Sequence, residues 1–170
     1  PDFSTYALLC VWENEECFEN FRKKNKWYLT YVNKSFNHKI LLLKPFFSKG
    51  LWSGENPFII KNNTKRDTSK KVLVLTRATL RISKLLRFWS FVNMASDAIK
   101  KAKGVEYFKG VGELPFIQQA TISIWKDEAS IDMFAYKNKN HSEIVRKTKR
   151  ESWYKEDMFT RFELIGEINN

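Results

Sequence analysis

The chain has 170 residues, of which 43% are hydrophobic and 15% aromatic, and its formal net charge is +11 at pH 7. This length and apolar content suit the folded core of one domain or two small ones. The composition excludes two classes of protein. Two cysteines do not make a disulfide framework, and no apolar run approaches the roughly 20 residues of a membrane-spanning helix.

The positive charge is spread along the whole chain, with concentrations in residues 61–71 and 137–150. A basic chain can bind nucleic acid, anionic membrane or acidic proteins, but lysines scattered in this way favour a solvated surface. Specific nucleic-acid binding is therefore disfavoured. The cysteine content fits a reducing compartment, so we expect a cytoplasmic protein, with peripheral membrane contact left open.

An internal repeat organises the chain, which resembles itself when it is shifted by 113 residues without a gap. Each copy reads as a strand–helix–strand unit, and its first strand lies over residues 3–12 in the first copy. Tyr28 stands where the second copy has His141. The matching positions include Phe3 with Phe116, Ala7 with Ala120, Trp12 with Trp125, Glu15 with Glu128, Phe21 with Phe134 and Phe46 with Phe159.

The first copy lacks the βαβ start that precedes the second copy. We therefore expect residues 1–60 to form a ferredoxin-like unit that is incomplete at its N-terminus by about 45 residues, the typical size of such a start. Residues 61–70 are predicted to be a basic connector loop, and residues 71–170 the second ferredoxin-like unit.

The second unit reads as six elements in the order βαββαβ. Alternating apolar residues predict a strand over 71–80, and Ser83 is placed to cap a helix that runs toward Gly104. A strand over 105–111, a turn at 112–115 and a strand over 116–125 follow. Asp127 is expected to open a helix, Asn140 a second one, and residues 159–168 to form the closing strand. This order predicts an α+β fold of tandem ferredoxin-like units.

His141 is one of only two histidines, and its sequence context is the one that most suggests a chemical role. With Asn140 as N-cap and Glu143 at N3, His141 would be the first residue of a helix and share its apolar stripe. The positive end of the helix dipole disfavours imidazolium, and a neutral imidazole can bind haem iron. A structural histidine that donates to a backbone carbonyl is the alternative.

Several short segments together resemble the spheroidene monooxygenase family of carotenoid ketolases. The resemblance covers nearly the whole chain, and it is the combination that is specific. The segments are 6–12 (YALLCVW), 50–54 (GLWSG), 75–81 (LTRATLR), 87–89 (RFW), 110–113 (GVGE), 119–125 (QATISIW), 134–136 (FAY), 146–148 (RKT) and 152–162 (SWYKEDMFTRF).

The resemblance implies a haem-containing monooxygenase of the dimeric α+β barrel class. In that class two ferredoxin-like sheets face each other, and haem can lie between a sheet and its second helix. A histidine near the start of that helix is the usual axial ligand in related barrels, and His141 is the matching position here. The resemblance thus implies that His141 binds the iron of a haem.

Five further residues are candidates for the same site, each with a structural alternative. Arg77 could polarise dioxygen on the distal side of a haem, or be a partly buried arginine paired with Glu113 or another carboxylate. Arg146 and Arg150 could bind haem propionates, or lie on a solvated face. Trp125 and Phe134 could wall a flat cofactor, or be core residues. One of Gln118 and Gln119 points inward, and the sequence leaves open which.

The expected function is haem-dependent oxygenation of a carotenoid-like or other apolar substrate. An electron donor such as a ferredoxin is the expected partner, and a homo-oligomer stays open. Two alternatives remain because fold and ligand do not fix chemistry. One is a haem-binding barrel with another oxidative or haem-handling role, and the other is a non-catalytic barrel with a structural His141.

Overall fold

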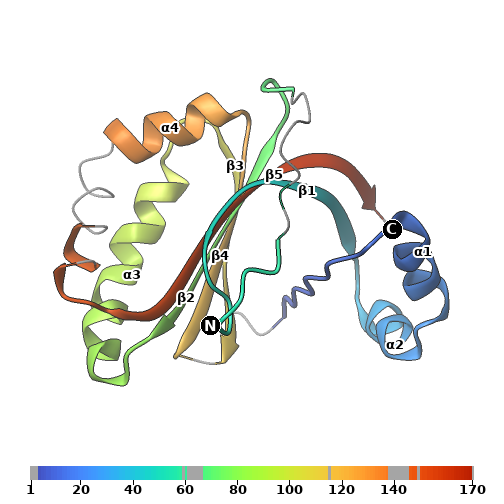
Figure 1. Cartoon of the computed structure of the whole chain (residues 1–170), viewed down its shortest axis with the longest axis horizontal. Coiled ribbons are helices and arrows are strands. Elements are labelled where there is room, and N and C mark those ends of the chain that lie inside the picture. Colours follow the sequence, from blue (N-terminus) through green and yellow to red (C-terminus); the bar gives the residue numbers. More distant parts are fainter. Residues whose placement is uncertain are drawn as a thin grey trace. The chain divides into compact units, whose positions relative to one another are not determined.

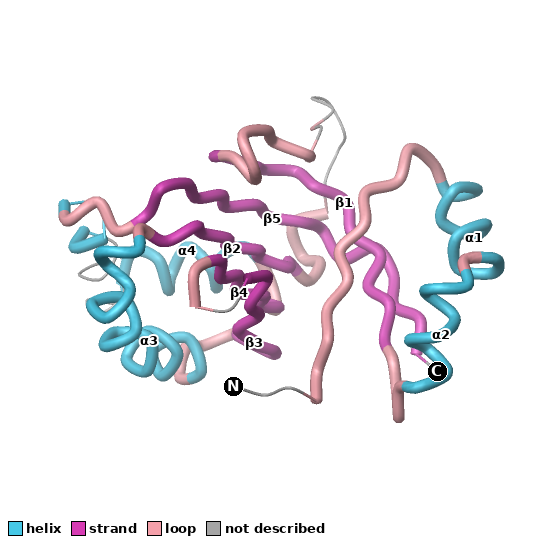
Figure 2. Tube along the Cα trace, turned by 90° about the horizontal axis from the view of Figure 1, so that it is seen from below, coloured by secondary structure: helices cyan, strands magenta, loops and turns pink. Residues whose placement is uncertain are grey.

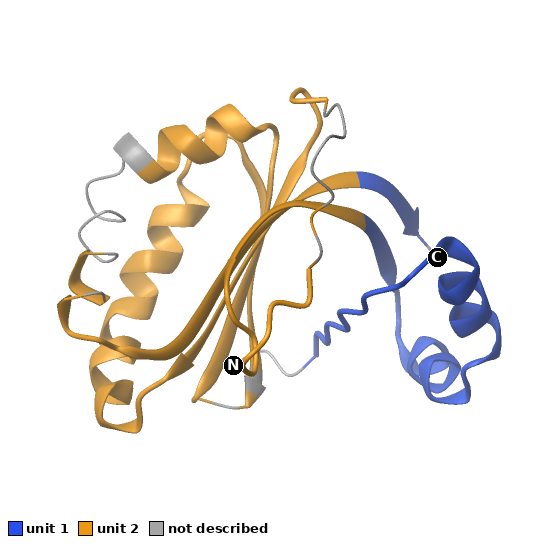
Figure 3. Cartoon of the chain, in the orientation of Figure 1, with its two compact units in different colours: residues 1–42, 165–170 blue, residues 43–164 orange. Residues whose placement is uncertain are grey.

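The structure is a computed structural model that describes residues 4–58, 60, 67–114, 116–137, 146–148 and 150–169. It divides into two compact units, a smaller one of residues 1–42 and 165–170 and a larger one of residues 43–164 (Figure 3). The sequence predicted domain boundaries at residues 60 and 70 from the internal repeat. The division into two compact units does not test these boundaries, which stay a prediction. Most of the expected connector, residues 61–66, lies outside the described residues.

A five-stranded sheet with the order β1-β5-β2-β4-β3 forms the centre of the larger unit (Figures 1 and 2). β2 pairs antiparallel with β4 and β5, and β3 pairs antiparallel with β4. The outer ends of β1 and β5 belong to the smaller unit. The strands are β1 (Lys39–Gly50), β2 (Val72–Leu80), β3 (Val105–Leu114), β4 (Gln118–Trp125) and β5 (Tyr154–Asn169).

Two helices, α3 (Leu85–Lys100) and α4 (Glu128–Lys137), lie on one side of this sheet (Figure 1). Asp127 caps α4, because its carboxylate accepts hydrogen bonds from the Ser130 backbone N–H at 2.8 Å and from the Ser130 hydroxyl at 2.7 Å. The order β2-α3-β3-β4-α4-β5 is the βαββαβ order expected from the sequence. The predicted α+β, ferredoxin-like architecture is therefore confirmed.

The two faces of the sheet follow from the alternation along β2. Val72 and Val74 point toward the helices and pack with Trp125 of β4 and Ile131 of α4 in one buried cluster. Opposite residues of antiparallel strands share a face, so the intervening residues of β2 lie on the far side with their partners. On that far side Leu73 is paired with Phe162, which stacks edge-on against Phe58 at 4.9 Å.

The smaller unit contains helices α1 (Glu15–Lys24) and α2 (Lys26–Lys34). The Asn14 side chain accepts from the Cys17 N–H at 2.9 Å, and the Asn25 side chain accepts from the Tyr28 N–H at 2.9 Å. Each helix therefore begins directly after an asparagine N-cap. Neither helix contains a buried residue.

Three local predictions were wrong. Residues 4–12 form no strand, although β4, their counterpart in the repeat, is a strand held between β2 and β3. Alternation produces a strand only where neighbours receive its backbone hydrogen bonds. Ser83 does not cap α3, because a 3-10 turn (Ile82–Lys84) leads into the helix. The turn expected at 112–115 comes later, since β3 continues to Leu114 and Phe116 takes a positive φ of 68°.

Candidate functional site

The helix-facing side of the sheet is floored by small residues at its centre. β2 contributes Thr76 and Ala78, β4 contributes Thr121 opposite Thr76, and β3 contributes Gly110 and Gly112. β2 has a strand on each side, so the side chain of a residue in its middle can reach solvent only from the face of the sheet on which it lies. Thr76 is solvent-exposed, and its face is the helix-facing one. We call the four that are not buried, Thr76, Gly110, Gly112 and Thr121, the small-residue floor, and Ala78 is buried beside it.

The space above this floor is open in the structure. A Cβ built on Gly110 would meet no atom within 4 Å, and one on Gly112 would meet only the Gln119 amide at 3.6 Å and 3.9 Å. α3 covers this side of the sheet without burying any of its own residues completely. Thr76, Gly110 and Gly112 are all solvent-exposed, so this part of the helix-facing side is accessible to a guest.

Aromatic side chains stand at both ends of the floor. At one end the rings of Trp125 and Phe134 lie 5.3 Å apart, and the Trp125 indole N–H donates to the Ser123 hydroxyl at 2.9 Å. At the other end the Phe88 ring of α3 lies 6.4 Å from both Trp153 and Tyr154. The floor therefore consists of small residues with aromatic side chains at both ends, and along its β5 side Thr76 is paired with Phe159 and Ala78 with Asp157.

Two polar side chains approach the floor. Gln119 is paired with Ala78 and lies on the helix-facing side, whereas Gln118 is paired with Thr79 and lies on the far side. Of the two glutamines, Gln119 is therefore the one that points toward the helices. Burial, and then the nearby Asp157 carboxylate, raises the pKa of Tyr154 to about 12. The Tyr154 phenol thus keeps its proton throughout the physiological range and can act as a donor.

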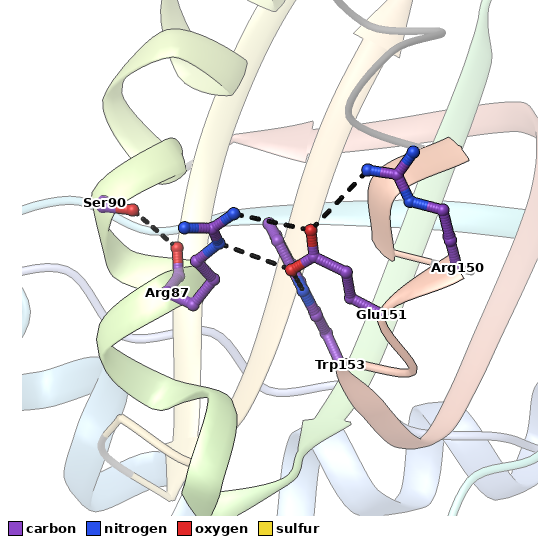
Figure 4. Close-up of polar contacts among 5 residues, drawn as sticks. All are labelled: Arg87, Ser90, Arg150, Glu151 and Trp153. Atoms are coloured by element: carbon purple, nitrogen blue, oxygen red, sulfur yellow. Dashed lines mark hydrogen bonds and ion pairs between the residues drawn. The ribbon is translucent and has the colours of Figure 1, made fainter.

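A cluster of charged residues joins α3 to the segment before β5 (Figure 4). The Glu151 carboxylate accepts from the Trp153 indole N–H at 2.9 Å and pairs with Arg87 at 3.3 Å. These contacts hold the pKa of Glu151 below its ordinary value, with the Trp153 hydrogen bond as the main cause. Arg150 reaches the same carboxylate at 3.9 Å, and the Lys147 ammonium lies 4.3 Å from the centre of the Phe91 ring.

Arg77 lies on the far side of the sheet from the small-residue floor. Its guanidinium is buried, donates to Glu156 at 2.6 Å and lies 5.2 Å from the Trp52 ring centre. Glu156 also accepts the backbone N–H groups of Ser53 and Gly54, both at 2.8 Å. This is the ion-paired alternative for Arg77, with Glu156 as the carboxylate.

The structure thus brings some of the candidate residues together and separates others. Trp125 and Phe134 are in contact with each other in the core beside the floor. Arg146 and Arg150 are exposed. Arg77 is on the opposite face, and His141 lies outside the described residues. Among the described residues, no group of three or more His, Cys, Asp or Glu side chains could hold a metal ion.

Sequence reasoning missed the floor itself. One signal was available: a threonine in the middle of the apolar strand β2, and two glycines two positions apart in the edge strand β3 on the other side of β4, leave the same region of the sheet without bulk. The open space at Gly110 and the aromatic side chains at both ends of the floor are compatible with a flat group such as the haem that the resemblance implies.

The chain is similar over nearly its whole length to three curated proteins named spheroidene monooxygenase. The protein of Cereibacter sphaeroides is 32% identical over 99% of this chain and 52% of its own length. The protein of Rhodobacter capsulatus is 27% identical over 98% of this chain and 69% of its own length. The chain is a relative of the spheroidene monooxygenases.

The resemblance drawn from the sequence motifs is therefore confirmed, with the third relative, from Rubrivivax gelatinosus, 28% identical over 95% of the chain. The chain spans about half the length of the Cereibacter sphaeroides relative. No model of a known protein family matches the chain.

Solved structures share the fold at low sequence identity. A protein of Fusobacterium nucleatum described as a candidate monooxygenase matches 91% of this chain and 67% of its own, with a TM-score of 0.55 and 10% identity. A Pseudomonas aeruginosa protein matches 59% of this chain and 100% of its own, with a TM-score of 0.51 and 9% identity. These likenesses support the ferredoxin-like architecture. Within the described part of the chain, no helix has the length and apolar character needed to cross a membrane.

Proposed function

We propose that the protein is a haem-dependent monooxygenase that acts on a carotenoid-like or other apolar substrate, with His141 as the axial ligand of the iron. The observation that carries this proposal is the sequence similarity to proteins named spheroidene monooxygenase over 95–99% of the chain. The small-residue floor supports it independently, because it offers an open, flat and apolar space on the helix-covered side of the sheet.

The repeat supports the choice of ligand. Tyr28 is the counterpart of His141, and its ring lies 5.2 Å from Phe21, the counterpart of Phe134. In the first copy, the side chain at this position therefore contacts the residue whose counterpart, Phe134, stands beside the floor. A neutral imidazole there would be suited to bind iron.

The chain's own residues would bind and shield the cofactor. The floor and the partly buried Phe134 ring would contact its flat face and exclude water, with Trp125 packed against Phe134 in the core. Arg146 and Arg150 would pair with propionates. The Tyr154 phenol, protonated below a pKa of about 12, would donate a hydrogen bond within the pocket. A bound haem would supply the oxidative chemistry with dioxygen and electrons from a donor such as a ferredoxin. Arg77 takes no part in this pocket, since it lies behind the sheet.

Haem titration tests the ligand directly. We expect the purified protein to bind haem with a Soret band, and His141→Ala to lose that band or shift it. His38→Ala is the matched control, because His38 is the other histidine of the chain and should leave the spectrum unchanged. Equal spectra for the two variants would overturn ligation by His141.

Product analysis tests the reaction. The haem-loaded protein, supplied with a reductant, a linear polyene and ¹⁸O₂, should yield a product that carries one ¹⁸O atom. Haem binding without any oxygenated product would favour the alternative of a haem-binding barrel with another role. Absence of haem binding would contradict the proposed function altogether.

A further inference from the structure

Helix α2 belongs to the smaller unit (Figure 1). It carries an exposed aromatic pair, Trp27 and Tyr31. The rings of Trp27 and Tyr31, one helical turn apart, lie 4.6 Å from each other, and the Tyr6 ring lies 6.5 Å from Tyr31. All three side chains are about half exposed or more, at 55%, 49% and 78% respectively. Large aromatic side chains gathered in this way on a surface usually mark an interaction site.

This pair is not part of the repeated fold. Tyr28, which follows Trp27 in α2, contacts Phe21 and is the position of this helix that aligns with His141. Trp27 and Tyr31 align instead with Asn140 and Ile144 of the second copy, which are not aromatic. The exposed pair is therefore an addition specific to the first copy.

The sequence around the pair is strongly basic. Between Arg22 and Lys39 there are six lysines and arginines and no aspartate or glutamate. Within this run Arg22 and Lys23 pair with Glu19, and Lys39 pairs with Glu167. The other three, Lys24, Lys26 and Lys34, are exposed and flank the aromatic pair along the chain. We call Tyr6, Lys24, Lys26, Trp27, Tyr31 and Lys34 the aromatic–basic face.

We propose that the aromatic–basic face docks the protein on the surface of an anionic lipid bilayer. Tryptophan and tyrosine favour the headgroup level of a membrane, where one end of the ring is apolar and the other wet. Lysines beside them are attracted by anionic headgroups. α2 has nine residues, so it would lie in the interface. This proposal rests on the proposed function, because an apolar polyene substrate resides in a bilayer. Vesicle binding itself requires neither haem nor substrate.

Vesicle flotation tests the proposal with the full chain. Wild-type protein should float with vesicles of phosphatidylcholine containing phosphatidylglycerol and stay behind with phosphatidylcholine alone. Replacing Lys24, Lys26 and Lys34 by Gln should weaken binding on the order of 100-fold, because each basic residue near an anionic surface contributes roughly a factor of five. The matched control replaces Lys100, Lys101 and Lys103, exposed lysines at the end of α3, by Gln and should bind much as wild type does.

A second variant separates the aromatic contribution from charge. Trp27→Ala with Tyr31→Ala leaves the net charge unchanged and should also lose binding to anionic vesicles. The proposal is overturned if wild type does not bind anionic vesicles, or if both lysine variants bind equally. It is also overturned if light scattering without lipid shows that Trp27 and Tyr31 hold two copies together. Failure of vesicle binding with normal haem spectra and product formation would leave the proposed function intact.

Discussion

The first helices of the two copies of the repeat form alike, but the two copies bury their residues very differently. Helices α1 and α4 begin and end at positions that differ by the same 113 residues. The Trp12 and Phe21 rings lie 4.9 Å apart at 50°, and their counterparts Trp125 and Phe134 lie 5.3 Å apart at 42°. Yet Trp12 is 36% exposed and Trp125 only 2%. Local sequence thus suffices for the helix and the ring pair, whereas burial depends on neighbouring strands.

The largest expected effect compares the two tryptophans. Trp125→Ala should lower the free energy of unfolding by about 3–5 kcal/mol, because it leaves a cavity in the core beneath α4. Trp12→Ala should cost only about 1 kcal/mol, since its side chain already contacts water. Urea denaturation of both variants measures the difference. Equal losses would mean that the two copies are buried to the same extent in solution.

The second prediction concerns the buried ion pair between Arg77 and Glu156 behind β2. Arg77→Met should cost about 2–4 kcal/mol, because it removes a buried partner of Glu156. Arg81→Met, at an exposed arginine just after the same strand, should cost about 0.5 kcal/mol or less. Thermal unfolding compares the two, and a negligible loss in Arg77→Met would contradict a structural role for the pair.

The third prediction sharpens the contrast within the second copy, between closed and open parts of its sheet. Ala78→Leu should destabilise by about 1–3 kcal/mol, because Ala78 is buried and the added atoms overpack the site. Thr76→Leu should change stability by about 0.5 kcal/mol or less, because Thr76 faces open space. A large loss in Thr76→Leu would show that the floor is already packed.

The smallest expected effect compares one carboxylate from each copy. Backbone N–H groups of Gly54 and Ser53, and then Arg77, lower the pKa of Glu156, while Arg22 and Lys23 lower the pKa of Glu19. A carboxylate whose pKa is lowered on folding stabilises the protein above its unfolded pKa of about 4.3, and this stabilisation is lost as pH falls through the folded pKa.

Glu156→Gln should therefore flatten the fall in stability on acidification below about pH 4.3, at low and at high salt. Glu19→Gln should flatten it less, and only at low salt, because Glu19 interacts with flexible side chains on the surface of a helix. Denaturation at several pH values in both salt conditions measures this. A salt-sensitive effect at Glu156 would show that its backbone hydrogen bonds are not formed.

The sequence predicted most of the fold because periodicity and capping are local. The alternation in β2, the Asp127 cap and the repeat predicted the positions of five helices and strands to within a few residues. It failed at residues 4–12, where alternation is present but strand neighbours are not, and at Ser83, where a 3-10 turn takes over.

The candidate site was less predictable because it depends on which residues share a face. Trp125 and Phe134 were predicted to line the same site, and their rings are in contact because they lie on elements that are adjacent in the chain. Arg77 was assigned to the same site, but it points away because its position in β2 has the opposite parity from Val72, the partner of Trp125. Thr76 and Gly110 carry no chemistry of their own, so only the strand register reveals that they form one open floor.

Haem titration of a variant with a filled floor is the most direct test of this account. Thr76→Leu should fold as wild type does and lose haem affinity at least about tenfold, as expected when one side chain blocks a well-fitted contact. Thr79→Leu, on the far side of the same strand, should bind haem as wild type does. Equal haem affinity for wild type and Thr76→Leu would contradict the assignment of the helix-facing floor as the cofactor site.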